Sequence, residues 1–137
     1  MKFRYRWLPD EKVCFVRYEG DWDTDGFIEA DTEIYAATHG DGVRFVFDAR
    51  RVQLEADTDE VRKYVEWLGS LNLAETHPKQ RAALVVTGAF ETAIAILIEN
   101  WTDEDTPFEI CSTMETACEK LGIASEILES VGDLSSR

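Results

Sequence analysis

Histidine and cysteine are scarce in this chain of 137 residues, which has two histidines and three cysteines. His39 and His77 lie in separate predicted loops without a partner at metal-ligand spacing, so we predict no zinc site and expect both side chains to be solvated. An odd number of cysteines in a chain without a signal peptide favours reduced, buried thiols over disulfides. We therefore expect an apolar core, rather than a metal or a disulfide, to stabilise the fold.

Basic residues are also few, because 14 Lys and Arg stand against 28 Asp and Glu, a net charge of −14. Proteins bind nucleic acids largely through basic side chains that neutralise phosphates, so this balance argues against DNA or RNA as a partner and against an anionic membrane surface. No run reaches the ~18 apolar residues of a membrane span. The first residues lack the apolar stretch of a signal peptide, and we expect a cytoplasmic protein.

Patterns that indicate catalysis are missing as well. The sequence has no glycine-rich phosphate loop, and no serine has a nearby histidine to activate it. Carboxylates are so plentiful that no pair stands out as a general acid and base. We therefore expect neither enzymatic activity nor a cofactor.

Hydrophobic patterns predict strands that alternate with amphipathic helices. The predicted strands cover residues 3–8, 13–18, 43–47, 82–86 and 108–111, and the predicted helices cover residues 25–38, 61–68, 89–101 and 114–121. A turn at residues 9–11 makes the first two strands an antiparallel hairpin, and the helical crossovers imply parallel pairing of the others. We predict one α/β domain over residues 1–122, with a mostly parallel five-stranded sheet, an antiparallel N-terminal edge strand and, for the whole chain, four to five helices. A C-terminal extension, residues 123–137, is predicted to form a short helix and then a frayed tail.

Capping residues mark the ends of two predicted helices. Asp57 with Glu60, and Ser112 with Glu115, have the spacing of a capping box. Gly122 follows the last residue of the second of these helices, where a glycine commonly ends a helix.

The predicted helix at 89–101 is apolar nearly all the way round over residues 93–98. A surface helix needs only an apolar stripe, so two interpretations are open. Either the C-terminal segment buries this helix, or its apolar residues form an interface or an apolar pocket. The residues concerned are Ile94, Ile96, Leu97, Ile98 and Trp101.

One acidic segment imitates a calcium loop. Asp21, Asp23 and Asp25 occupy positions one, three and five of an EF-hand loop, and Gly26 occupies position six. Position twelve, which requires a bidentate Glu, is Thr32, and the preceding segment is a predicted strand rather than a helix. Weak calcium binding is therefore only a minor alternative, and we predict no metal at this segment.

Polar side chains gather at the predicted carboxyl ends of the parallel strands, where sites in open α/β sheets usually form. The third strand is followed by Asp48, Arg50 and Arg51. These arginines are suited to hold an anion or to pair with the surrounding acids.

The order of elements resembles the SpoIIAA-like branch of the STAS fold. Three segments carry the likeness, namely residues 12–20 (KVCFVRYEG), 43–52 (VRFVFDARRV) and 108–122 (FEICSTMETACEKLG). The resemblance implies parallel strands wound with helices, an antiparallel N-terminal edge strand and a regulatory role. Sporulation-type members are phosphorylated on a serine within Asp-Ser-Ser-Gly, and Thr58 takes that position here. The aspartate, first serine and glycine of the motif are lost, and Asp57 and Asp59 would repel a phosphate.

Two functional hypotheses follow. The first is a non-enzymatic protein-interaction or regulatory module that forms a homodimer or binds another protein. The second, suggested by the similarity of the STAS fold to SEC14-like lipid carriers, is a carrier or sensor of a small apolar ligand. A carrier would need a cavity of ~300 Å³ or more, which we expect Ile94, Leu97, Trp101 and Trp67 to line.

Overall fold

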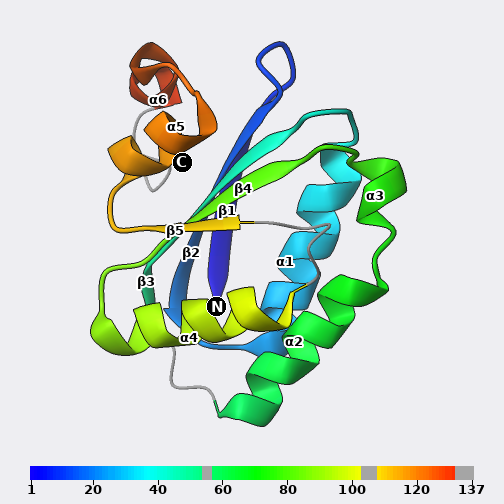
Figure 1. The fold of residues 1–137 in the computed structure, drawn as a ribbon, viewed down its shortest axis with the longest axis vertical. Coiled ribbons are helices and arrows are strands. Elements are labelled where there is room, and N and C mark those ends of the chain that lie inside the picture. The colour runs from blue at the N-terminus through cyan, green and yellow to red at the C-terminus, as the bar shows by residue number, and fades with distance from the viewer. Residues whose placement is uncertain (54–56, 103–107, 132–137) are drawn as a thin grey trace.

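The computed structural model describes residues 1–53, 57–102 and 108–131, and strands and helices alternate along the chain (Figure 1). Five strands form one sheet in the order β1-β2-β3-β4-β5. β1 is antiparallel to β2, and the other neighbours are parallel. The strands are β1 (Lys2–Leu8), β2 (Val13–Asp21), β3 (Arg44–Gln53), β4 (Arg81–Val85) and β5 (Phe108–Cys111). The predicted α/β class, the hairpin and the antiparallel edge strand are confirmed.

The described residues form six helices, one more than the upper end of the prediction. They are α1 (Thr24–Ala37), α2 (Thr58–Ser70), α3 (Leu73–Thr76), α4 (Ala89–Trp101), α5 (Met114–Leu121) and α6 (Ser125–Val131). The unpredicted α3 is a single turn, which is too short to show a helical period. β3 is longer than predicted because residues 51–53 pair with residues 19–21 of β2 beyond a bulge.

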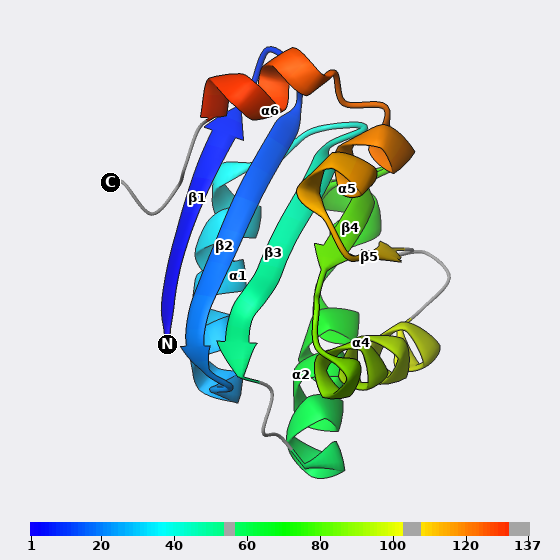
Figure 2. The same cartoon turned by 90° about the vertical axis from the view of Figure 1, so that its left-hand side faces the viewer.

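Helices cover the two faces of the sheet unequally. α1, α2 and α4 share a core with one face, where Phe45 and Val16 are fully buried. α5 and α6 pack on the opposite face, around Phe15 and Val46. Figure 2 shows α1 behind the sheet and α5 with α6 in front of it. The C-terminal helices therefore do not bury α4, and that interpretation of its apolar sequence is wrong.

The helix caps confirm one prediction and correct another. The Asp57 side chain accepts a hydrogen bond from the Glu60 backbone N–H at 2.8 Å, as expected at the start of α2. α5 has the predicted bounds, but its N-cap lies one residue later than predicted, because Thr113 rather than Ser112 accepts from the Thr116 N–H. Gly122 ends α5 with a φ of 68°, in the left-handed region that glycine adopts easily.

The remaining sequence predictions concern the cysteines and the tail. Cys14, Cys111 and Cys118 are free and buried, as expected, and burial raises the pKa of Cys14 to about 12. The tail predicted to be frayed, residues 132–137, lies outside the described residues. Among the helices of the described residues, none has the length and apolar character to cross a membrane.

Candidate functional site

An apolar cavity of about 100 Å³ lies between the sheet and the helices α1, α2 and α4. The sheet supplies alternate residues of β3 and β4, because side chains separated by two positions point to the same face, together with Tyr18 of β2 and Phe108 of β5. Aromatic and aliphatic side chains dominate the lining, which includes Tyr18, Trp22, Phe27, Phe47, Tyr64 and Leu84.

Small residues explain why this part of the core is not filled. Ala49 of β3, Ala82 of β4 and Ala95 of α4 all line the cavity. Ala49 and Ala95 are buried, with exposed fractions of 4% and 0%. Protein cores are normally close-packed, so three short side chains around one space leave room for a guest.

One wall of the cavity is an aromatic cluster. The ring of Phe27 lies 4.7 Å from that of Tyr18 and 4.8 Å from that of Trp22, measured between centroids. Tyr64 completes the cluster, with its ring 5.7 Å from Phe27 and edge-on to Trp22 at 6.0 Å. Tilted and edge-on rings of this kind are favourable contacts, and an aromatic guest could extend them.

A buried carboxyl group holds the two tyrosines of this wall. The hydroxyls of Tyr18 and Tyr64 donate to the two oxygens of Asp31, each at 2.5 Å. Asp31 is 1% exposed, and burial raises its pKa to about 6, although the tyrosine hydrogen bonds act in the opposite direction. The triad links β2, α1 and α2, and it occupies both hydroxyl donors.

Gln80 introduces a polar group into this apolar lining. Its side chain is 8% exposed and lies at the cavity wall just before β4. The Oε1 atom is buried and has no hydrogen-bond partner within the described residues, a property shared there only with Nε of Arg6. Because a buried carbonyl without a partner is costly, a ligand that donates to Gln80 would relieve that cost.

A groove of about 350 Å³ lies next to the cavity, between α1, the end of α2 and α3. Tyr35 and Leu73 line both spaces, so these two side chains separate the groove from the cavity. Trp67 and His39 lie in the groove wall. A displacement of these two side chains would join the groove to the cavity.

His77 corrects the expectation of two solvated histidines. His39 is exposed as predicted, but His77 is only 2% exposed. Its Nε2 lies 3.2 Å from the Thr38 hydroxyl, and its Nδ1 lies 2.8 Å from the Thr76 hydroxyl. Burial lowers the pKa of His77, so the neutral ring acts as a structural link between α1 and α3.

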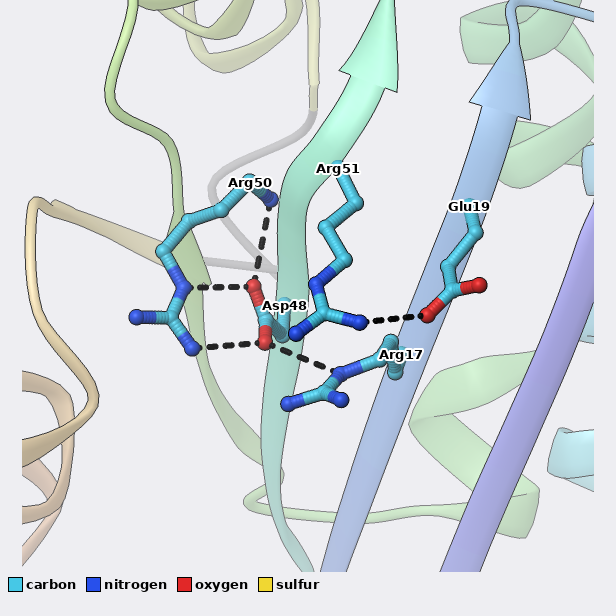
Figure 3. A network of polar contacts seen from close by, with 5 residues as sticks. All are labelled: Arg17, Glu19, Asp48, Arg50 and Arg51. Atoms are coloured by element: carbon cyan, nitrogen blue, oxygen red, sulfur yellow. Dashed lines mark hydrogen bonds and ion pairs between the residues drawn. The ribbon is translucent and has the colours of Figure 1, made fainter. Parts of the chain in front are cut away.

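The predicted strand-end cluster does form, on the opposite face of the sheet (Figure 3). Arg50 donates through Nε and Nη2 to the two oxygens of Asp48, both at 2.9 Å. Arg17 of β2 approaches the same carboxylate at 3.4 Å. Burial tends to raise the pKa of Asp48, but the hydrogen bonds from Arg50 outweigh it and the pKa is lowered. Arg51 pairs separately with Glu19, at 3.1 Å.

These contacts decide between the two interpretations of the arginines. The Asp48 side chain is 2% exposed, and the Arg50 and Arg17 side chains are 34% and 11% exposed. The cluster is thus an internal ion-pair network in which both Asp48 oxygens are already bound. Pairing with surrounding acids, rather than an open anion site, is what the structure shows at this position.

The apolar residues of α4 divide into two groups. Ile94 and Ile98 are buried at 7% and 8% exposure, whereas Ile96 is 46% exposed. Leu97 and Trp101 are half-buried, and the guanidinium of Arg62 lies 4.7 Å from the Trp101 ring centroid. Of these α4 residues only Ile98 lines the cavity, and Trp67 lines the groove instead. The lining expected from sequence is therefore largely wrong.

The calcium-like segment does not assemble a cage. Asp21 ends β2, Asp23 precedes α1, and Asp25 lies in the first turn of α1, where it pairs with Lys63 at 3.4 Å. All three aspartates are exposed. Across residues 1–53, 57–102 and 108–131, no three His, Cys, Asp or Glu side chains are grouped as metal ligands.

Thr58 is the first residue of α2 and is exposed. Asp57 and Asp59 flank it, and both are exposed too. Phosphorylation of Thr58 stays a prediction.

Sequence reasoning missed Asp31 and Gln80. Asp31 had a detectable signal, because it lies four residues after Phe27 and three before Ile34, on the buried face of α1. Gln80 had none, since it lies in a loop whose position depends on the tertiary fold. No family model matches the chain, and the comparisons with curated proteins and with solved structures found no match either.

Proposed function

We propose that this protein is a non-enzymatic regulatory module whose cavity binds one small, mainly apolar molecule. The observation that carries the proposal is the aromatic-lined cavity with an unpartnered Gln80 oxygen at its wall. Ligand sites are typically apolar spaces with a few polar groups that orient the ligand. A non-enzymatic role is supported by Asp31, whose oxygens already accept from two tyrosines.

The size of the cavity supports a small guest rather than a lipid. At about 100 Å³ it is smaller than the ~300 Å³ of a drug-sized site. An apolar cavity of about 150 Å³ binds benzene, and this cavity is smaller, so one ring is the upper limit of the guest's size. A larger ligand would have to extend past Tyr35 and Leu73 into the groove.

A regulatory role is supported by the order of elements. Strands β1 to β5 follow one another across the sheet, with an antiparallel first strand, as the resemblance to SpoIIAA-like proteins implies. Membership of that family is part of the proposal and rests on this order and on the segments that carry the likeness. A cytoplasmic location is part of the same proposal.

Binding of benzene, followed by two-dimensional amide NMR, tests the proposal. We expect benzene to shift the resonances of cavity-lining residues and those next to them. Ala82→Leu, which adds three carbons to the cavity wall, should abolish these shifts. Ala124→Leu, an exposed position before α6 on the opposite face, should preserve them. If benzene near its solubility limit shifts no cavity resonance in the wild type, the proposed function is wrong.

A homodimer through α4 is a second candidate, because this helix exposes apolar side chains. Phe90 is 54% and Ile96 46% exposed, and Ala93 lies exposed between them at a spacing of three residues. Sedimentation of Ile96→Glu measures how much these exposed α4 side chains contribute to dimer formation. We expect it to convert a dimer to a folded monomer, while Ala124→Glu leaves the dimer intact. A wild-type monomer at high concentration would refute the dimer.

A further inference from the structure

Gln80 brings to the cavity lining a buried acceptor without a hydrogen-bond partner among the described residues. The hydroxyls of Tyr18 and Tyr64 donate to Asp31. The Thr102 hydroxyl donates to the Glu99 carbonyl at 3.0 Å, and Nε1 of Trp22 donates to the Thr24 hydroxyl at 2.8 Å. These four lining donors are in use, whereas the buried acceptor Oε1 of Gln80 has no partner in the described parts of the chain.

The shape of the ligand follows from the walls. Aromatic rings of β2, α1 and α2 surround the space, and an aromatic guest would continue their tilted packing. The volume limits the ligand to at most one ring. Gln80 determines that the ligand needs a hydrogen-bond donor. A ligand with only an acceptor would leave the glutamine oxygen unpaired and bury a second acceptor beside it.

We infer that the cavity selects a single-ring aromatic molecule with one hydrogen-bond donor, such as a phenol, and that Gln80 is the residue that determines this selectivity. The inference rests on the proposed function and adds the ligand class. The donor points at Oε1 of Gln80, and the ring lies against the Phe27 and Tyr18 side of the cavity. Any substituent on the ring is directed toward Tyr35, Leu73 and the groove.

Calorimetric affinities of phenol, toluene and cyclohexanol separate the parts of this inference. Phenol and toluene have similar shapes and differ in the donor, while cyclohexanol keeps the donor and loses the aromatic ring. In the wild type we expect phenol to bind more tightly than cyclohexanol. Gln80→Met keeps the length of the side chain but removes the acceptor, and we expect it to weaken phenol about tenfold and to leave toluene within about twofold.

Gln53→Met is the matched control, because Gln53 is the other glutamine of the chain and is exposed at the end of β3. It should change none of the three affinities. Gln80→Leu is a second variant that also removes the acceptor, in case the methionine packs poorly. In the wild type, phenol should also shift the side-chain amide resonances of Gln80, whereas toluene should shift them less.

The outcomes distinguish the inference from the proposed function. If toluene binds but Gln80→Met leaves the ratio of phenol to toluene affinity unchanged, the donor assignment is wrong and the ligand-binding function stands. If cyclohexanol binds as tightly as phenol, the aromatic preference is wrong. If none of the probes binds, both the inference and the proposed function are overturned.

Discussion

Arg50 lies two residues after Asp48 and donates three hydrogen bonds to its carboxylate. The guanidinium donates one hydrogen bond of 2.9 Å to each oxygen, and the backbone N–H donates one of 3.1 Å to Oδ1. Arg17 approaches from the neighbouring strand, directly across the register from Asp48. A carboxylate that is 2% exposed and bound by two guanidinium groups fixes the end of the sheet where β2 and β3 bulge.

Asp48→Ala should lower the free energy of unfolding by about 3 kcal/mol, because it leaves two cations near the sheet without their anion. Urea denaturation at pH 7 measures the loss. Glu19→Ala is the control, since the Glu19–Arg51 pair has side chains 34% and 54% exposed and should contribute below about 1 kcal/mol. Equal losses for the two variants would contradict a special role for Asp48.

Asp31 should make stability depend on pH in the opposite sense to an ordinary surface carboxylate. Its pKa in the folded protein is raised to about 6, above its ordinary value of 3.8. The folded state therefore binds the proton more tightly than the unfolded state. The resulting contribution of Asp31 to the free energy of unfolding is fully present below pH 3.8 and is lost as the pH rises through 6.

Denaturation of the wild type and of Asp31→Asn at pH 7 and pH 5 tests this effect. Relative to the variant, the wild type should gain about 1 kcal/mol on going to pH 5. The comparison with the variant removes the background of the other carboxylates. If the difference between the two proteins stays constant or shrinks toward pH 5, the raised pKa of Asp31 is refuted.

Ile96 and Ile98 should respond differently to the same truncation. Ile98→Ala removes a buried side chain that lines the cavity and should cost about 3 kcal/mol of stability. Ile96→Ala, two residues away on the exposed side of α4, should change stability by less than about 0.5 kcal/mol in the monomer. Thermal or urea unfolding at low protein concentration measures both. A costly Ile96→Ala would show that α4 is rotated or covered.

Gln80→Met should stabilise the ligand-free protein, although it removes a polar side chain. The substitution eliminates a buried carbonyl without a partner and should raise the free energy of unfolding by about 1 kcal/mol. Gln53→Met, at an exposed position, should have little effect. A clear loss of stability in Gln80→Met would mean that the Gln80 oxygen is satisfied in the free protein.

Local patterns in the sequence were sufficient for most of the secondary structure. The helix at 89–101, the strand at 108–111 and the hairpin of β1 and β2 have the predicted places. Periodicity and turn residues carry this information because they act between residues close in the chain. The cap of α5 was misplaced by one residue, since Ser112 and Thr113 are chemically alike and only the backbone conformation distinguishes them.

The predictions that depended on packing were less successful. The sequence predicts a solvated His77, because nothing in its neighbours along the chain reveals that α3 brings it against Thr38 at the end of α1. The sequence did not show what packs against the apolar residues of α4. In the structure α5 and α6 lie on the other face of the sheet, so they do not bury this helix.

The sequence by itself determined the order of the strands and longer helices, the sign of the charge, and the capping residues Asp57 and Gly122. Only the tertiary structure decided that Tyr18, Asp31 and Tyr64 meet, that Arg17 shares Asp48 with Arg50, and that a cavity remains beside Gln80. The physical reason is that these features join side chains from separate elements. Burial, an open hydrogen bond and a shifted pKa are properties of that convergence and not of any single segment.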